Sequence, residues 1–306
     1  MSSLELLQYS ELEREKILKI YGRTPQNICQ DIDSIKEWLE KQPHLPEIPD
    51  NKIIENFLLM NKFKIEKVKQ KIDMYYSIRT LIPEFFDKNP NSPAIQKIMN
   101  SIYVLPLPKL TNGLHRVFIA GKIIDQDPDN LDCTDYLAFL YNQIEMRLRH
   151  DCNLAMIYVY DLLNLKSGHL LKFTPTLIKK MAFIGDKVFT TKLEAVHVIN
   201  APPFLDSFMS FFKGFLKPKL ADRIFIHKNM DTFYEMIPKE ILPKDYGGQE
   251  KSLDELRDEW QKLFLKYDPL YKHLQTLKVN EELRTGKPIE SDILGIQGNF
   301  RKLDID

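Results

Sequence analysis

The residue types that carry out catalysis are present in this sequence, but their spacing matches no catalytic motif. The seven histidines are scattered, and none stands at metal-ligand spacing from another. The chain lacks the GxSxG nucleophile elbow, the HExxH zinc motif, the P-loop and the GxGxxG dinucleotide turn. Its 11 glycines among 306 residues give little material for phosphate-binding loops. We therefore expect no enzymatic activity, no metal and no cofactor.

Two polar residues lie where a sheet could present them to a ligand. His197 belongs to the strand-like run Val196-His197-Val198, and strand alternation places it on the face opposite the two valines. We predict a structural, hydrogen-bonded histidine. Asp161 follows the run 157–160 at the carboxyl end of a predicted strand, where open α/β sheets hold ligand groups. Because the sequence offers it no base, nucleophile or metal partner, we interpret Asp161 as a turn or helix-capping acceptor.

The segment 201–228 indicates the binding of an apolar partner. Pro202-Pro203 suits the start of a helix, and the residues that follow place a broad apolar face opposite a polar one. Such a helix has to bury five phenylalanines. Two interpretations stay open: a core helix packed on the sheet, or a movable lid over a bound lipid. The apolar face consists of Phe204, Leu205, Phe208, Met209, Phe211, Phe212, Phe215 and Leu216.

A basic stretch overlaps and follows that helix. Over the whole chain 43 Lys and Arg balance 43 Asp and Glu, so we expect no nucleic-acid partner of the uniformly basic type. Between 213 and 228, however, five bases stand against one acid, a net charge of +4. Positive charge beside an apolar helix suits an anionic membrane surface. The bases are Lys213, Lys217, Lys219, Arg223 and Lys228, and the acid is Asp222.

The elements that would position this segment change class along the chain. From Leu4 to about Phe86, apolar residues recur at helical spacing and predict an all-α region. The run Asn89–Pro93, rich in proline and asparagine, predicts a linker. Beyond it, β-like runs alternate with helical stretches, which predicts an α/β domain with a mostly parallel sheet. The expected strands are 116–120, 154–160, 195–199 and 223–227, and the expected helices are 132–149, 170–187 and 203–216.

The expected fold class is therefore α/β, an N-terminal helical bundle followed by a ligand-binding α/β domain with a lid helix. The expected boundaries are 1–93 for the helical domain, 94–250 for the α/β domain and 251–306 for a C-terminal helix and tail. Ser252 and Glu255 form a capping box that predicts the start of the C-terminal helix.

The composition is that of an ordinary globular protein. It is 43% hydrophobic and 28% charged, and the longest nearly uninterrupted apolar run, 154–160, is far shorter than the ~20 residues of a membrane-spanning helix. The N-terminus has no basic stretch before an apolar core, so we expect a cytoplasmic protein. Cys29, Cys133 and Cys152 form no CxxC pair, and we expect reduced, mostly buried thiols. We expect a monomer.

Several motifs, taken in order, resemble those of a known family. They are the run from His197 to Pro202, the apolar helix, Phe215-Leu216, Arg223-Ile224, and the run from Leu242 to Gly248. In this order they resemble the CRAL-TRIO lipid-binding family, in the branch of the α-tocopherol transfer, retinaldehyde-binding and clavesin proteins. The stretch from Phe57 to Phe63 and Tyr75-Tyr76 resemble the N-terminal helical domain of that family. The run 298–304 resembles the ends of insect members.

The resemblance implies a carrier of one hydrophobic small molecule, such as a tocopherol, retinoid, carotenoid or similar isoprenoid. The ligand would lie beneath a lid helix at about 203–216 and move between membranes. The resemblance also implies reversible docking on anionic lipid, including phosphoinositides, although Glu194 and Leu59-Met60-Asn61 stand where a relative has basic residues. The expected membrane-binding residues are Lys192, Lys217, Lys219 and Arg223. The expected ligand wall comprises Tyr141, Ile157, Val159, Ile184, Phe189, Val196, Val198, Phe204, Phe208, Phe211 and Phe212.

Three other functions stay open at this point. A phospholipid or phosphoinositide exchange protein would need polar groups inside its cavity to pair the headgroup. A small-molecule hydrolase or isomerase would convert its ligand. An adaptor that acts through the N-terminal helices without a ligand would have a dry, collapsed cavity.

Overall fold

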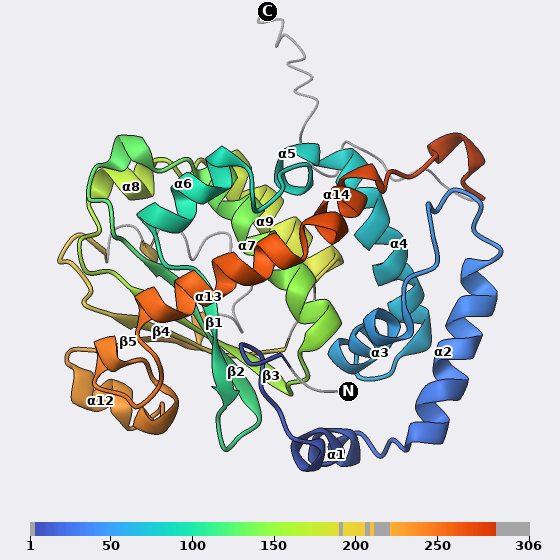
Figure 1. The fold of residues 1–306 in the computed structure, drawn as a ribbon, viewed down its shortest axis with the longest axis horizontal. Helices are drawn as coiled ribbons and strands as arrows, with labels where there is room; N and C mark the ends of the chain where they lie inside the picture. Colours follow the sequence, from blue (N-terminus) through green and yellow to red (C-terminus); the bar gives the residue numbers. More distant parts are fainter. Residues whose placement is uncertain (1–3, 190–191, 206–208, 211–220, 286–306) are drawn as a thin grey trace, which may run out of the picture.

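The computed structural model describes residues 4–189, 192–205, 209–210 and 221–285. Figure 1 shows the N-terminal helices α1 to α4, drawn in blue, at one end of the molecule and the β-sheet towards the other end. The helix α13 (Leu253–Lys266), drawn in orange, runs obliquely between these regions. Among the described residues, no helix combines the length and the apolarity that crossing a membrane requires.

Six helices of the described chain precede the sheet, and the first five lie in the region 4–86 that the helical spacing predicts to be all-α. Ser10 forms a capping box with Glu13 at the first helix, and Thr24 caps the second, which has Pro25 in its first turn. Asp50 precedes the third helix but makes no capping bond through its side chain. The six helices are α1 (Glu11–Ile20), α2 (Pro25–Leu39), α3 (Asn51–Met60), α4 (Ile65–Leu81), α5 (Pro83–Phe86) and α6 (Pro93–Ser101).

The sheet has five strands in the order β1-β2-β3-β4-β5. The first pair is antiparallel, and the other three pairs are parallel, which confirms the predicted mostly parallel α/β sheet. Tyr158 lies opposite Val196, and Tyr160 lies opposite Val198, so these four side chains share one face. The strands are β1 (Leu105–Leu110), β2 (His115–Lys122), β3 (Ala155–Asp161), β4 (Leu193–Ile199) and β5 (Ile224–Ile226).

The strand β1 is the one that the sequence does not predict. It contains Pro106 and Pro108, and proline cannot donate a hydrogen bond to a neighbouring strand. These prolines fit the strand because β1 forms one edge of the sheet. The N-terminal segment approaches this edge as well, because the backbone N–H of Gln8 donates to the carbonyl of Pro108 at 2.8 Å.

The predicted helix 132–149 and the predicted helix after Ser252 are present, whereas the predicted helix 203–216 lies mostly outside the described residues. The stretch predicted as one helix over 170–187 is two, because Thr174 and Pro175 begin a new helix with a side-chain cap. The predicted capping box of Ser252 and Glu255 is present at the start of α13. These helices are α7 (Cys133–His150), α8 (Ser167–Leu171), α9 (Pro175–Lys187), α12 (Met230–Tyr234), α13 and α14 (Asp268–Thr276).

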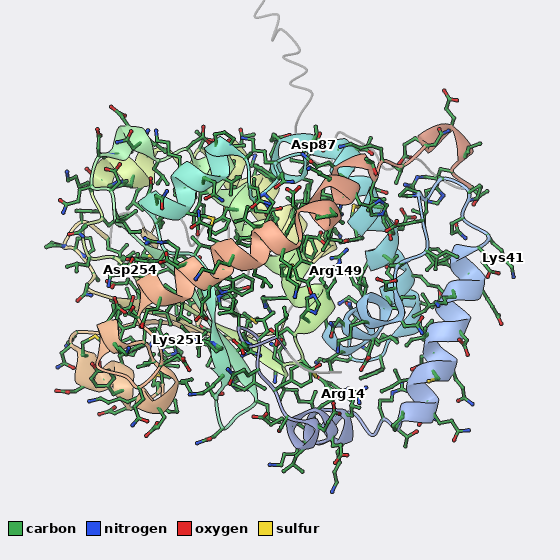
Figure 2. All side chains as sticks on the ribbon, viewed as in Figure 1. Arg14, Lys41, Asp87, Arg149, Lys251 and Asp254 are labelled. Atoms are coloured by element: carbon green, nitrogen blue, oxygen red, sulfur yellow. The ribbon has the colours of Figure 1, made fainter. Side chains whose placement is uncertain are left out.

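Buried ion pairs fix α7 against the N-terminal helices. Glu145 of α7 accepts hydrogen bonds from Tyr75 (2.8 Å), from Arg149 (2.6 Å) and from Arg79 of α4. Burial alone would raise the pKa of Glu145, but the two guanidinium groups outweigh it and lower that pKa. Figure 2 shows Arg149 on the ribbon in the middle of the molecule. Since a buried charge without a partner is very unfavourable, this cluster makes the relative position of α4 and α7 specific.

A second buried cluster joins the sheet to the end of α7. Arg116 of β2 donates to Asp151 at 2.7 Å and to the carbonyls of Leu107 and Gln8 at 3.0 Å. Arg147 donates to the same carboxylate at 3.2 Å. The pKa of Asp151 would rise through burial, but the two arginines lower it. The cluster therefore connects the N-terminal segment, β1, β2 and α7.

The cysteines are free thiols, as expected. Cys133 and Cys152 are buried, whereas Cys29 is exposed. Burial raises the pKa of each buried thiol to about 12, which keeps both protonated at neutral pH.

Candidate functional site

An apolar cavity of about 250 Å³ lies on the sheet face that carries Tyr160, Val196 and Val198. Its floor comes from four neighbouring strands, β2 to β5, so the parallel register brings together residues far apart in the sequence. The floor residues are Ala120, Gly121, Tyr160, Leu193, Val196, Val198 and Ile224.

The segment after β3 forms one wall of the cavity. It contains Leu162 and Leu165, then α8 with His169 and Leu170, and ends at Phe173. Tyr136 of α7 and Met181 of α9 complete this side, together with Ile102, Ile123 and Leu131. Asp161 is the one charged side chain among the described residues of the lining, which otherwise suits an apolar ligand.

The predicted lid helix also reaches the cavity in its described part. Leu205 is buried and lines the cavity, as does Met209. Both belong to the apolar face that the sequence indicates. Phe204 is half-buried and is not part of the lining, and Phe208, Phe211 and Phe212 lie outside the described residues.

A second hollow, of about 340 Å³, adjoins the apolar cavity at the carboxyl ends of β4 and β5. The two share Leu205. The second hollow is more polar, because Asn200, His227, Lys228 and Asn229 contribute to its lining. The apolar cavity is therefore the better candidate for a hydrophobic ligand.

Of the strand residues expected in the ligand wall, the structure brings together only Val196 and Val198 at the cavity. Ile157 lies opposite Ala195, and Val159 lies opposite His197, so both point to the other face of the sheet. Strand alternation separates the two pairs in this register, so of these four residues only Val196 and Val198 line this cavity.

Three further residues expected in the ligand wall lie in a packed region away from the cavity lining. Tyr141 and Phe189 stack with ring centroids 5.9 Å apart and an interplanar angle of 25°. Phe86 stacks on Tyr141 at 5.2 Å, and Tyr75 meets Phe189 edge to face at 6.1 Å. Ile184 is fully buried in the same core. These residues connect the N-terminal helices to α7 and α9 by aromatic packing.

Asp161 accepts hydrogen bonds at one end of the cavity, which confirms its interpretation as a turn acceptor. Its Oδ1 accepts from the backbone N–H of Leu163 (3.0 Å) and from Asn200 Nδ2 (2.7 Å). Its Oδ2 accepts from the hydroxyl of Tyr246 at 3.2 Å, and Lys122 Nζ lies 3.7 Å away. The carboxylate therefore has partners for both oxygens and links β3 to the segment that carries Tyr246.

His197 occupies the sheet face opposite the cavity, as predicted from strand alternation. Its Nδ1 lies 2.8 Å from Nε2 of His227, and Nδ1 of His227 lies 3.1 Å from the hydroxyl of Thr232. Burial, followed by the nearby His227, lowers the pKa of His197 to about 4. The pair is neutral at pH 7 and has a structural, hydrogen-bonded role.

The two described basic candidates, Lys192 and Arg223, meet at the amino ends of β4 and β5. Arg223 donates from its side chain to the carbonyl of Leu193, the residue after Lys192. Glu194 lies beside one of these cations: its carboxylate is 3.9 Å from Lys192 Nζ and 4.0 Å from His115 Nε2. Lys217 and Lys219 lie outside the described residues.

Sequence reasoning missed most of the wall between Leu162 and Phe173. The available signal was the density of leucines directly after a strand, at the sheet edge where α/β proteins place their ligands. It also missed Tyr160, although Tyr158 and Tyr160 alternate with Val159 and therefore had to face the other side. No group of three His, Cys, Asp or Glu within the described residues could hold a metal ion.

Two family models match separate parts of the chain. Residues 24–95 match the UBA domain of Pinta-like proteins, and residues 114–248 match the CRAL/TRIO domain. The first match covers α2 to α5, and the second covers the sheet from β2 onwards together with the cavity.

Curated relatives match most of the chain. The human (Homo sapiens) alpha-tocopherol transfer protein-like protein is 27% identical over 235 residues, which cover 75% of this chain and 68% of the relative. Clavesin-1 of Rattus norvegicus is 24% identical over 241 residues, covering 76% of this chain and 67% of the relative. Among solved structures, the crystal structure of Sfh5 aligns with 85% of this chain and 100% of that chain, with a TM-score of 0.44 and 14% identity.

Proposed function

Since residues 114–248 form a CRAL/TRIO domain, we propose that this protein is a lipid carrier that holds one hydrophobic small molecule and transfers it between membranes. The observation that carries the proposal is the apolar cavity of about 250 Å³, with walls from the sheet, from α7 to α9 and from the predicted lid. We propose an isoprenoid such as a tocopherol, retinoid or carotenoid as the ligand class. The name of the alpha-tocopherol transfer protein-like relative supports a role in transfer.

The described lining favours a neutral ligand over a phospholipid. It contains no lysine or arginine, and its one charged side chain is the carboxylate of Asp161. A phosphate in the cavity would meet that carboxylate and no lysine or arginine of the described lining, and it would lose its hydration. A phospholipid or phosphoinositide exchange function is therefore the weaker candidate.

Burial of an isoprenoid would make spontaneous release slow. At about 0.8 kcal/mol per buried CH₂, a ligand of roughly 20 carbons gains more than ~10 kcal/mol from leaving water. We propose that docking on an anionic membrane favours an open lid and so speeds release. The proposed docking residues are Lys192, Lys217, Lys219 and Arg223.

We propose that the segment from Leu162 to Phe173, which follows the carboxyl end of β3, adds a hydrophobic contact with the membrane. Its inner residues line the cavity, whereas Leu171 is 81% exposed and Leu163 is 49% exposed. The exposed Lys166 lies between them in the sequence. Figure 1 shows α8 at the periphery of the molecule. Leucines that enter the lipid beside a cavity wall would bring the ligand close to the membrane during transfer.

The carrier function is tested by identifying what the purified protein holds. We expect native mass spectrometry to show one neutral lipid per chain, and organic extraction to recover it unchanged after long incubation. A phospholipid in the extract would support the exchange function instead, and a converted ligand would indicate an enzyme. A protein that takes up no lipid from vesicles would contradict both transfer functions.

Docking is tested separately with Leu171→Asp, which removes the most exposed leucine of the wall. We expect its sedimentation with phosphatidylserine-containing vesicles to fall about tenfold, because the free energy of burying one leucine side chain is lost. Leu265→Asp is the matched control, since Leu265 is 60% exposed on α13, away from the cavity lining. Equal losses in the two variants would contradict docking at α8.

A further inference from the structure

The hydroxyl of Tyr160 is an unpaired polar group on the cavity floor. The side chain lines the cavity, yet the hydroxyl makes no hydrogen bond with any described residue and is not among the fully buried polar atoms. Burial, followed by the neighbouring Tyr158, raises the pKa of Tyr160 to about 12, so it stays a neutral donor and acceptor. A ligand that covers this hydroxyl without pairing it would withdraw it from water, which is unfavourable.

The other polar side chains of the lining already have protein partners or no accessible polar atom. Tyr136 donates its hydroxyl proton to the carbonyl of Ala120 at 2.6 Å. Asp161 accepts from Leu163, Asn200 and Tyr246. His169 accepts the N–H of Lys166 at Nδ1 (3.0 Å), and its Nε2 is fully buried, without surface for a ligand. Tyr160 is thus the polar group that is left for a bound molecule.

We propose that the Tyr160 hydroxyl forms a hydrogen bond with an oxygen atom of the ligand, so that the protein selects oxygen-bearing isoprenoids over hydrocarbons of the same skeleton. This inference rests on the proposed carrier function. The oxygen belongs to a neutral group, such as an alcohol, phenol or aldehyde, because the described lining offers no cation to pair a carboxylate. A site that leaves a buried hydroxyl unpaired in the complex discriminates against the analogue without oxygen.

The position of Tyr160 also fixes the orientation of the ligand. Its ring lies near Gly121, where an added Cβ would stand 3.6 Å from Tyr160 Cδ1, and its backbone pairs with Val198. The oxygen end of the ligand therefore lies on the sheet floor, and the hydrocarbon occupies the apolar remainder of the cavity.

The experiment compares phytol with phytene, the hydrocarbon of the same branched skeleton. The protein is incubated with phosphatidylcholine vesicles that contain equal amounts of both probes, recovered, extracted and analysed by mass spectrometry. We expect the wild type to take up phytol in about tenfold excess over phytene after correction for their partitioning in the vesicles. Tyr160→Phe should lose most of this preference through weaker phytol uptake, with phytene uptake unchanged.

Tyr158→Phe is the matched control. Tyr158 lies two residues away on the same face of β3, makes no hydrogen bond among the described residues and does not belong to the cavity lining. This variant should keep the preference for phytol. Uptake of both probes without preference in the wild type, or an unchanged preference in Tyr160→Phe, would overturn the inference and leave the carrier function standing. Uptake of neither probe would overturn the isoprenoid carrier and this inference with it.

Discussion

The interface between α4 and α7 and the apolar cavity share the helix α7, and they are built in opposite ways. At the interface, Glu145 binds Arg79, Arg149 and Tyr75, and the aromatic rings around Tyr141 pack closely. At the cavity, the described lining has one charged side chain and about 250 Å³ of unfilled space. The interface has its polar groups paired and its volume filled, whereas the cavity has unfilled space and a tyrosine hydroxyl, that of Tyr160, without a partner among the described residues.

This difference separates the residues that hold the walls from the residues that meet the ligand. Both α7 and α9 contribute to the cavity, through Tyr136 and Met181, and both also contact the N-terminal helices. Because those helices fix the walls through specific ion pairs, the cavity can stay open without collapsing. The cost of an unfilled core is then offset elsewhere in the structure.

The largest expected effect on stability is at the interface between α4 and α7. Glu145→Ala leaves the buried Arg79 and Arg149 without their carboxylate, and we expect the free energy of unfolding to fall by about 3–5 kcal/mol. Urea denaturation measures this loss. Glu15→Ala, on the exposed part of α1, is the control and should change stability by less than ~0.5 kcal/mol. A loss below ~1 kcal/mol for Glu145→Ala would show that the ion cluster does not fix the interface.

The second effect concerns the histidine pair on the sheet face opposite the cavity. The pKa of His197 is lowered to about 4 in the folded protein, so the unfolded chain binds more protons below about pH 6.5. Proton binding to the unfolded chain therefore leaves the free energy of unfolding unchanged above that pH and lowers it progressively as the pH falls towards 4. Between pH 8 and pH 5 the reduction is about 2 kcal/mol.

The pH dependence of urea denaturation checks the histidine prediction. His197→Gln should flatten the dependence by that amount, whereas His273→Gln should preserve it, because the ring of His273 is half exposed and binds Glu47. Identical slopes in the wild type and in His197→Gln would contradict the lowered pKa of His197 in the folded protein.

The third effect concerns the apolar cavity. Val196→Trp adds volume inside the cavity, so we expect lipid uptake to fall more than tenfold while the free energy of unfolding changes by less than ~1 kcal/mol. Val159→Trp makes the same change on the packed face, where the side chain is fully buried, and should be strongly destabilising. Similar destabilisation by both substitutions would mean that the cavity is no emptier than the core.

The smallest effect is at the amino ends of β4 and β5. Glu194 is half exposed beside Lys192 and His115, and it reduces the positive charge available to a membrane. Glu194→Gln should raise the affinity for phosphatidylserine vesicles about fivefold at low salt, since one charge near such a surface contributes about 1 kcal/mol. The exposed Glu240 supplies the control, Glu240→Gln. No gain over this control would remove Lys192 from the docking surface.

The alternation of helices and strands could be predicted from the sequence, because it depends on local periodicity and capping. Ser252 with Glu255 and the strand around Val196 are examples. The strand β1 could not be predicted, since Pro106 and Pro108 argue against a strand unless its position at the edge of the sheet is known. The domain boundary at Asn89–Pro93 stays a prediction, although Asn91 donates to the carbonyl of Phe264 at 3.0 Å and so ties this stretch to α13.

The lining of the cavity could be predicted only in part, because the sequence does not show the register in which neighbouring strands pair. Alternation shows that Val196 and Val198 share a face, and that Ile157 and Val159 share one, but it does not say which face meets the ligand. Phe189 and Tyr141 have the residue types of a ligand wall and serve instead as packing between helices. The spacing of aromatic residues reveals burial, and it does not distinguish a filled core from a cavity.

The two edges of the sheet have a consequence for the behaviour of the protein in concentrated solution. An unpaired edge strand can add a strand from another molecule and so begin aggregation. Here the β1 edge carries Pro106 and Pro108, and the β5 edge is only three residues long. Neither edge offers a continuous ladder of hydrogen-bond donors and acceptors to a second chain. The molecule can thus display hydrophobic side chains such as Leu171 for contact with lipid while its sheet remains a poor template for self-association.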